Sequence, residues 1–321
     1  MARQRKKKGD PVHGWLNLFK PVDMTSTQAV AICKRMLNAQ KVGHGGTLDP
    51  LADGILPLAF GEATKTVAFT MEADKEYVFT VEWGKATASY DAEGVVIATS
   101  DVRPDRTAIE ATLSRFKGEI EQVPPKFSAI KVDGERAYDL ARDGEEFELE
   151  ARAVTVHEAE LVDMPDADHA VFRVCSGKGF YVRAMARDIA HALGTEGYIT
   201  QLRRTRVGDF TEADAVTLDE LTALSEAGDV PGLMDQLDPL EAPLGFLPFV
   251  EIDREGARHL GQGRTIVLLP HVVEHFRAHR AAGAIGELDL SRLAVAVHGG
   301  AAIAMGEVRA GRFQPVRVFQ V

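Results

Sequence analysis

The chain is poor in cysteine, poor in aromatic side chains and free of long apolar runs. Cys33 and Cys175 are its two cysteines among 321 residues, and both lie inside apolar patterns, which suits a reducing cytoplasm. No uninterrupted stretch of about 18 apolar residues occurs, so no segment is predicted to span a membrane. The sequence also lacks Cys/His metal-ligand spacing, a Walker phosphate loop, a dinucleotide fingerprint and a GxSxG elbow. Phosphate hydrolysis and hydride transfer therefore have no support, and no metal or organic cofactor is expected.

The formal net charge is −11, and the basic residues are unevenly distributed. The acidic total argues against indiscriminate nucleic-acid binding. It does not argue against a local basic surface, because a phosphate responds mainly to nearby charges. Five basic residues lie between Arg3 and Lys8, and Gly9-Asp10-Pro11 follows in place of the apolar core of a secretory signal. We predict a disordered basic tail over 1–12 that could contact a polyanion.

Hydrophobic periodicity predicts helices and strands over the first two thirds of the chain. The clearest strand is 75–84, where Tyr77, Phe79, Val81 and Trp83 share one face. Further strands are predicted at 15–19, 55–60, 153–162 and 169–175. Helices are predicted at 62–72, at 181–193 and from Thr217 to about Gly228. Two more are predicted to begin with a capping box: one at 26–38, with Thr25 and Gln28, and one that starts with Thr107 and Glu110.

Two segments interrupt this pattern. Residues 118–150 contain Pro124-Pro125, Gly134 and Gly144 around a short helical stretch near 135–142, which indicates a loop-rich excursion from the core. Residues 231–248 hold four prolines and two glycines, which is typical of a linker. Short strands are predicted beyond it, at 265–269, 293–297, 301–305 and 315–319. The length also favours two domains, the second being small and rich in strands.

Gly43–Gly54 is the most unusual stretch of the sequence. It holds four glycines, one proline, one histidine and two aspartates in twelve residues. Glycine permits backbone conformations that a side chain forbids and proline fixes φ, so this is a shaped loop. Shaped loops on a rigid scaffold often carry catalytic groups. Read alone, the loop is equally consistent with an ordinary turn in which Asp49 caps the backbone before Pro50.

Motifs from distant positions accompany this loop. They are Lys20-Pro21 with Thr25-Ser26, Lys75-Glu76-Tyr77, Pro124-Pro125-Lys126-Phe127-Ser128-Ala129-Ile130-Lys131, and Lys178-Gly179-Phe180-Tyr181-Val182-Arg183. Together with Gly43–Leu56, and in this order, they resemble the motifs of the TruB family of bacterial tRNA pseudouridine-55 synthases. The segment beginning at Pro124 is similar to the family's RNA-gripping insertion, the thumb. The resemblance covers roughly residues 13–245.

The resemblance implies an α+β fold. A pseudouridine synthase domain would occupy 13–240, with a mixed, largely antiparallel sheet flanked by helices and a thumb-like insertion at about 118–150. A small β-rich, PUA-like RNA-binding domain would occupy 241–321. The implied activity is isomerisation of uridine 55 in the T arm of tRNA to pseudouridine, after the base has flipped out of its stack. The implied partner is the T-arm stem-loop of tRNA, bound by a cytoplasmic monomer with no obligatory protein partner and no cofactor.

The resemblance also implies roles for single side chains. Asp49 would be the catalytic carboxylate, and it is left open whether it adds to the uracil ring, attacks C1′ or acts as a base to give a glycal. Arg183 would pair with Asp49 and hold it ionised, and Tyr77 would stack on the flipped uracil. The other implied substrate-binding or supporting residues are His44, Tyr181, Leu202, Lys20 and Lys178. Plainer alternatives are core packing for Tyr77 and Leu202, and a surface position for His44, Arg183 and Lys20.

Several residues have an open role. Asp53 stands where the family commonly has threonine or serine, and it adds a negative charge near the catalytic position. Asp91 is explained equally well by a place near the active site and by an Asx turn. The glycines of the loop would leave room for an RNA backbone and a flipped base. Arg203, Arg204 and Arg206, with Lys178 and Arg187, form the best candidate phosphate-binding patch, and 271–290 is similar to an insertion in the C-terminal module.

Two other hypotheses stay open at this point. The chain could be a related synthase that acts on ribosomal RNA or on sites selected by a guide RNA. It could also be an RNA-binding folding factor for tRNA in which chemistry is secondary.

Overall fold

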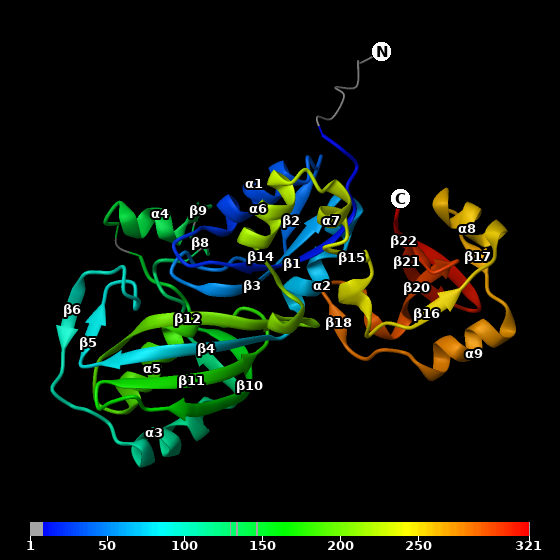
Figure 1. Ribbon diagram of the computed structural model, residues 1–321. Coiled ribbons are helices and arrows are strands. Elements are labelled where there is room, and N and C mark those ends of the chain that lie inside the picture. Colours follow the sequence, from blue (N-terminus) through cyan, green and yellow to red (C-terminus); the bar gives the residue numbers. More distant parts are fainter. Residues whose placement is uncertain (1–8, 129, 133, 146, 321) are drawn as a thin grey trace.

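The computed structural model describes residues 9–128, 130–132, 134–145 and 147–320, and its strands form two main sheets. The larger sheet contains β1 (Gly14–Lys20), β2 (Val42–His44), β3 (Asp53–Phe60), β4 (Lys75–Trp83), β7 (Gly118–Gln122), β10 (Arg152–Asp163), β11 (His169–Ser176), β12 (Gly197–Val207), β13 (Phe210–Thr211), β14 (Val216–Thr217) and β15 (Leu237–Asp238). Its main order is β14-β1-β3-β12-β4-β11-β10-β7. Figure 1 shows this sheet to the left of the smaller one.

The larger sheet is mixed and largely antiparallel, which confirms the predicted fold class. β3 runs parallel to β12 and β1 runs parallel to β14, whereas the other neighbours along the main order are antiparallel. β12 was not predicted, although it lies between β3 and β4 near the middle of the sheet. Its pairing with β4 contains two register shifts, at Ile199/Gln201 and Arg204/Arg206. These shifts break the period-two alternation by which a strand is recognised in a sequence.

Helices cover the larger sheet and continue into the C-terminal part. They are α1 (Ser26–Met36), α2 (Val67–Glu72), α3 (Arg106–Leu113), α4 (Ala137–Arg142), α5 (Val182–Ala192), α6 (Leu218–Glu226), α7 (Val230–Met234), α8 (Arg254–Gly261) and α9 (Pro270–Ala278). Among the described residues, no helix is long and apolar enough to cross a membrane. The capping boxes at Thr25 and Thr217 are confirmed. The one at Thr107 is wrong, because the Asp105 side chain accepts from Ala108 N at 2.8 Å and starts α3 earlier.

The core of the larger unit lies between the sheet and α5. The face of β4 that was predicted to be apolar is buried, with Phe79, Val81 and Trp83 each about 1% exposed or less. α5 packs Met185 and Ile189 into the same cluster. Burying each such side chain contributes about 1.5–3 kcal/mol, so this layer fixes the position of α5 on the sheet.

Two short hairpins lie outside the main sheet of this unit. β5 (Lys85–Thr87) pairs with β6 (Val96–Thr99), and β8 (Lys131–Val132) pairs with β9 (Glu135–Arg136) next to α4. The segment 118–150, predicted to be a loop-rich excursion, begins as β7, which extends the main sheet beside β10. Its root is therefore part of the sheet and the excursion starts only after Gln122.

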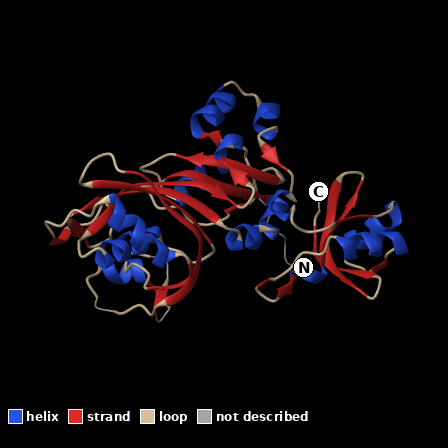
Figure 2. Ribbon diagram, turned by 90° about the horizontal axis from the view of Figure 1, so that it is seen from below, coloured by secondary structure: helices blue, strands red, loops and turns tan. Residues whose placement is uncertain are grey.

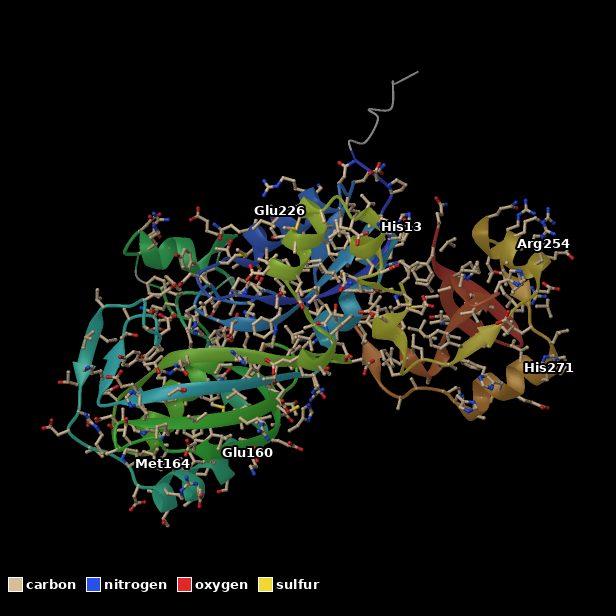
Figure 3. The ribbon with its side chains drawn as sticks, in the orientation of Figure 1. His13, Glu160, Met164, Glu226, Arg254 and His271 are labelled. Atoms are coloured by element: carbon tan, nitrogen blue, oxygen red, sulfur yellow. The ribbon has the colours of Figure 1, made fainter. Side chains whose placement is uncertain are left out.

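The C-terminal part forms a five-stranded sheet with the order β16-β20-β21-β22-β17. These strands are β16 (Phe249–Glu251), β17 (Ile266–Val267), β20 (Leu293–His298), β21 (Ala301–Arg309) and β22 (Arg312–Val318). The predicted strand-rich module is confirmed, but α8 was missed. The segment 271–290 holds most of α9 and the hairpin of β18 (Ala284–Ile285) and β19 (Leu288–Asp289). Figure 2 shows this unit to the right of the large sheet, and Figure 3 labels Arg254 on α8 and His271 on α9.

One apolar cluster joins the two units. It contains Trp15, Phe69 and Phe210 from the large unit together with Leu240, Leu290 and Leu293. The Trp15 indole nitrogen donates to Thr66 Oγ1 at 3.2 Å and to Leu240 O at 3.3 Å, so its polar atom is also satisfied inside this cluster. The shared core stabilises one arrangement of the two units.

The predicted disordered tail over 1–12 is only partly tested. Residues 1–8, with all five basic side chains, lie outside the described residues. The prediction is wrong for 9–12, because Asp10 N donates to Asn38 O at 2.6 Å and the Val12 side chain is buried in the main core. His13, labelled in Figure 3, follows directly and accepts from Glu62 N at 3.1 Å.

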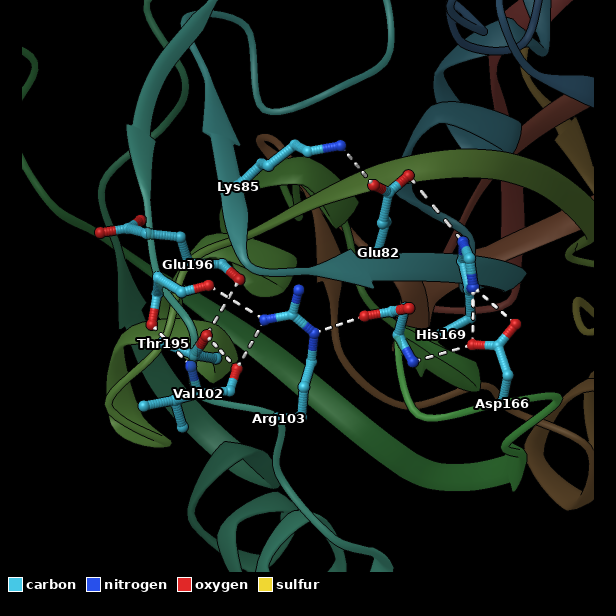
Figure 4. Close-up of polar contacts among 10 residues, drawn as sticks. Glu82, Lys85, Val102, Arg103, Asp166, His169, Thr195 and Glu196 are labelled. Carbon is cyan, nitrogen blue, oxygen red and sulfur yellow. Dashed lines mark hydrogen bonds and ion pairs between the residues drawn. The ribbon is translucent and has the colours of Figure 1, made fainter.

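A polar network ties loops together at the end of β4 that is remote from Tyr77 (Figure 4). Arg103 forms an ion pair with Asp168 and donates to Ser100 O and Val102 O. His169 contacts Asp166 at 2.8 Å, and Glu82 pairs with Lys85 at 3.1 Å. Exposed pairs of this kind contribute about 0–1 kcal/mol each, so this network fixes loops without setting the fold.

The close approach of β3 and β12 generates a stability prediction. Gly54 has φ +105°, and a Cβ at this position would lie 2.2 Å from Arg204 O. Gly54→Ala should therefore lower the free energy of unfolding by about 2 kcal/mol or more, and the melting temperature by several degrees, in a thermal scan. Gly43→Ala is the matched control, since no heavy atom lies within 4 Å of its Cβ position. Equal melting temperatures for the two variants would contradict the prediction.

Candidate active site

Asp49 lies in the loop between β2 and β3, and the interior of the protein holds this loop on several sides. Gly45 N donates to Pro57 O at 2.8 Å, and Ala52 N donates to Asp49 O at 3.1 Å. The Ser26 hydroxyl accepts from Leu48 N and donates to Leu48 O, both at 2.9 Å. The side chain of Asp49 nevertheless stays 35% exposed. The loop therefore presents one reachable carboxylate on a fixed backbone.

Arg204 on β12 supports the loop from inside. Its side chain is 2% exposed, and the guanidinium donates to Ile55 O at 2.8 Å and to Thr47 O and Gly46 O at 3.2 Å each. Its assignment to a phosphate-binding patch is wrong, because these donors are used by backbone carbonyls and the group is closed to solvent. The sequence offers no local signal for this role, since Arg204 and its acceptors are about 150 residues apart.

Lys20, at the end of β1, supports the same loop from another side. It is fully buried, and its ammonium donates to Pro21 O at 2.7 Å, to Met24 O at 2.8 Å and to Pro50 O at 3.5 Å. Burial lowers the pKa of Lys20 to about 8, and the nearby charge of Asp53 opposes this effect. The alternative of a surface lysine is wrong. Lys20 anchors the backbone immediately after Asp49.

Arg183, in the first turn of α5, reaches Asp49 from across the site. Its side chain is 8% exposed. One terminal nitrogen lies 3.1 Å from Asp49 Oδ2 and donates to Phe127 O at 2.9 Å. The other lies 3.3 Å from Asp91 Oδ2 and donates to Ser89 O at 3.2 Å. The predicted pair with Asp49 is present, and a second carboxylate balances the buried cation.

Asp91 has both of the functions that were left open. It accepts from the Ser89 hydroxyl and from Glu93 N, at 3.1 Å in the second case, as in an Asx turn. It also pairs with Arg183 and is 3% exposed. Tyr90, between these residues, has a positive φ of 57°. The turn at 89–91 therefore aims a carboxylate at Arg183 through a backbone that most residues avoid.

Tyr77 on β4 lies close enough to Asp49 for the charge of that carboxylate to act on its phenol. Its ring centre lies 6.4 Å from that of Phe180, and the ring is half-buried against the main core. Burial raises the pKa of Tyr77, and the Arg204 charge opposes the rise. Arg204 is its cross-strand neighbour on β12, and Leu202 pairs with Phe79 two residues further along the strands. Leu202 is 7% exposed and belongs to the main core, as its plainer alternative stated.

His44, at the end of β2, and Tyr181, directly before α5, are the remaining residues expected at the site. The His44 ring nitrogen Nδ1 accepts from Gly46 N at 3.3 Å, and burial lowers the pKa of His44. Both effects favour a neutral ring. The main chain of Tyr181 is held by Gln122, whose Oε1 accepts from Tyr181 N at 2.8 Å. Burial raises the pKa of the Tyr181 phenol, so its hydroxyl stays protonated at neutral pH.

The remaining members of the expected phosphate patch are divided. Lys178 is not joined to Asp49: its ammonium pairs with Glu72 at 2.8 Å. Arg187 is 13% exposed and pairs with Asp188 at 2.7 Å. Arg206 contacts the Cys175 sulfur at 3.2 Å. Of the three β12 arginines, Arg203 has the most solvent exposure on its side chain, at 49%.

Asp53 and the loop glycines also receive a structural explanation. The Asp53 carboxylate accepts from Arg203 Nε at 3.0 Å and from the terminal nitrogen at 2.7 Å, in a two-bond pair. A Cβ at Gly45 would lie 2.7 Å from Thr70 Oγ1. The expectation that the glycines leave room for RNA is therefore wrong for Gly45 and Gly54, where the crowding atoms belong to the protein itself.

Comparison with known proteins adds the family. Residues 34–182 match the TruB family pseudouridylate synthase N-terminal domain, and residues 183–245 match the tRNA pseudouridylate synthase B C-terminal domain. The chain is 54% identical over 317 residues to tRNA pseudouridine synthase B of Caulobacter vibrioides, with 99% of each chain covered. It is 45% identical over 314 residues to the protein of the same name from Rhodospirillum rubrum, with 98% of each covered.

The chain belongs to the TruB family. Solved structures agree with this at the level of the fold. A chain in the crystal structure of a Cbf5–Nop10–Gar1 complex has 26% identity and a TM-score of 0.70, covering 100% of this chain and 91% of that one. A chain in the structure of an H/ACA RNP bound to a substrate RNA containing 2′-deoxyuridine has the same TM-score at 23% identity, covering 100% and 92%. Within the described part of this TruB-family chain, no group of three or more His, Cys, Asp or Glu side chains could hold a metal ion.

The buried ammonium of Lys20 generates a pH prediction. Its pKa is about 8 in the folded TruB-family chain and about 10.4 when unfolded, so the unfolded state binds more protons between these values. The stability that Lys20 contributes is therefore present above pH 10.4 and is lost as the pH falls through 8. The melting temperature of the wild type should rise relative to Lys20→Met between pH 8 and 10. A parallel scan of the exposed control Lys34→Met should show no such trend, and a wild type that falls relative to Lys20→Met would contradict the prediction.

Proposed function

We propose that this protein is a tRNA pseudouridine(55) synthase, an isomerase that converts uridine 55 in the T arm of tRNA to pseudouridine. One observation carries the proposal: a partly exposed carboxylate, Asp49, lies on a loop anchored by the interior and 3.1 Å from the buried guanidinium of Arg183. The membership of the TruB family and the names of the close relatives support the choice of substrate.

The reaction needs one nucleophile or base and no change of oxidation state. The N1–C1′ glycosidic bond breaks, the uracil rotates and a C5–C1′ bond forms. The hydrogen on C5 leaves as a proton and N1 takes up a proton, so the product is an isomer of the substrate. A carboxylate can divide this change into two easier steps through a covalent intermediate. We assign that role to Asp49. Attack on the uracil ring, attack on C1′ and proton removal to give a glycal are all compatible with its exposed oxygen atoms.

Arg183 and Tyr77 serve this carboxylate in different ways. Arg183 fixes its direction, because the guanidinium is itself held by Asp91, Ser89 O and Phe127 O. Tyr77, beside Phe180, offers an aromatic face to a base that has left its stack. We expect His44 and Tyr181 to border the space that the base would occupy. Leu202 would support the pocket from the core side. Lys178 stays a proposed RNA contact, and to bind RNA it would have to break its ion pair with Glu72.

The substrate defines the remaining proposals. We expect the insertion over 118–150 to contact the T-arm stem-loop and the C-terminal unit over 241–321 to act as a PUA-like module that binds the acceptor end. The protein would work as a monomer without an obligatory protein partner, in the cytoplasm where tRNA is used. A ribosomal or guide-selected RNA target is the second hypothesis, and activity on isolated tRNA without added proteins or guide would argue against it.

The first test of the function uses Asp49. Wild type mixed with unmodified tRNA that carries tritium at uracil C5 should release the label, because that hydrogen is lost on isomerisation. Asp49→Asn should reduce the release by about 10⁴-fold or more, since an amide is a poor nucleophile and a poor base. No release by stoichiometric wild type would overturn the assignment. Undiminished release by Asp49→Asn would instead support an RNA-binding folding factor whose chemistry does not use this loop.

A second prediction concerns Asp53, four residues from the proposed catalytic carboxylate. Asp53→Ser removes one negative charge and the two-bond partner of the half-exposed Arg203 guanidinium, which keeps a looser contact of 3.8 Å with Glu212. We expect tighter tRNA binding with a steeper salt dependence, the slope of log K against log salt growing by about 0.7–0.9 for one added phosphate contact. The double variant Asp53→Ser with Arg203→Gln is the control and should lose the added slope. An unchanged slope in Asp53→Ser would mean that Arg203 does not face RNA.

A further inference from the structure

The segment 122–127, which leads from β7 into the insertion, is fastened to the start of α5 by buried side chains. Gln122 is 2% exposed, and its amide makes two bonds to the main chain of Tyr181. Oε1 accepts from Tyr181 N at 2.8 Å, and Nε2 donates to Tyr181 O at 3.1 Å. The Gln122 amide thus bonds to Tyr181 N and O as the backbone of a neighbouring strand would. Tyr181, a residue of the proposed uracil pocket, is therefore held by the start of the insertion.

Arg187 makes a second connection one helical turn after Arg183. Its terminal nitrogen donates to Val123 O at 2.9 Å, and its guanidinium carbon lies 5.4 Å from the centre of the Tyr90 ring. Asp188 holds the same guanidinium at 2.7 Å. Arg187 therefore joins the segment 122–127 to the turn 89–91.

Arg183 joins the same two segments on the side of Asp49. It donates to Phe127 O in the first segment and to Ser89 O in the second, and it pairs with Asp49 through the nitrogen that also contacts Phe127. The two arginines, at i and i+4, thus form parallel bridges on one face of α5. A displacement of either bridged segment removes acceptors from Arg183.

We propose that Gln122 and Arg187 are positioning residues for the isomerisation: they hold the segments 122–127 and 89–91 in the arrangement that directs Arg183 at Asp49. Neither residue has a contact with Asp49 itself. Both act through Tyr181, Val123 and Tyr90, and the insertion becomes part of the active-site frame as well as an RNA contact. This inference rests on the proposed function.

A phosphate contact is the competing role for Arg187. Its side chain is 13% exposed, and its donors are directed at Asp188 and at the Val123 carbonyl. A phosphate ligand would need a free and accessible fork of donors. The two roles differ in what they change: a positioning role affects the rate of the bound complex, whereas a phosphate contact affects affinity and its salt dependence.

The test compares the single-turnover rate of tritium release with the Kd for the same T-arm RNA. Gln122→Met keeps the length of the side chain and removes both bonds, and Arg187→Met keeps the stem and removes the guanidinium. Each should slow the bound complex by about 10-fold or more while Kd stays within about twofold, because small displacements of a reacting group are costly. Arg187→Lys should recover part of the rate. The exposed Arg115→Met is the matched control and should keep the wild-type rate.

Gln122→Glu covers the case in which Gln122→Met fails to fold. A glutamate can still accept from Tyr181 N, but it presents a second acceptor to Tyr181 O, so its rate should fall by several-fold at unchanged Kd. Wild-type rates in these variants, or a change in Kd alone, would overturn the inference. A wild type that releases no tritium would overturn the proposed function instead. An active wild type with unaffected variants would overturn only the positioning roles.

Discussion

The buried guanidinium of Arg183 is the contact on which the arrangement of the site depends. Its two terminal nitrogens face two carboxylates and two carbonyl oxygens from the loop at 49, the turn at 89–91 and the segment at 127. A cation with 8% exposure is stable only when such partners surround it, because desolvation of an unpaired charge costs several kcal/mol. The dependence between the guanidinium and its partners is mutual. The guanidinium needs these segments, and the segments, which are far apart in the chain, are brought together by it.

The loop that carries Asp49, the proposed catalytic residue, is shaped by the interior of the protein and not by its own sequence alone. Lys20 and Arg204 direct six donor contacts at backbone carbonyls on or near the loop. Five of these carbonyls lie outside helices and strands and so lack regular backbone partners, whereas Ile55 O belongs to β3. Gly45 and Gly54 let the loop approach Thr70 and the backbone of β12. The backbone atoms on the inner side of the loop therefore already have hydrogen-bond or packing partners within the protein. Asp49 remains accessible because its side chain points away from them, toward Arg183.

The distribution of arginines shows why charge along a sequence is a poor guide to an RNA surface. Arg203, Arg204 and Arg206 are close neighbours on β12, yet they have three different surroundings: a carboxylate pair with Asp53, a buried set of carbonyls, and the Cys175 sulfur. Alternation along a strand sends neighbours to opposite faces, and the register shift after Arg204 changes the alternation again. Three arginines that are close in the sequence therefore do not form one basic surface in the fold.

The sequence by itself determined much of the fold and the identity of the central residues. Period-two alternation located β4 and helical spacing located α1 and α5, because these signals are local. The resemblance of compact motifs to those of the TruB family assigned Asp49, Tyr77 and Arg183 to one site. For Lys20 the tertiary structure decided between the implied support of the loop and a surface position, and for Arg204, Gln122 and Arg187 it alone showed what they contact. Each of them is a polar side chain whose meaning depends on which backbone atoms from distant segments surround it once β12 and α5 are in place. No pattern within a few residues encodes such a contact, since the cost of burying a charge is offset by partners that folding alone assembles.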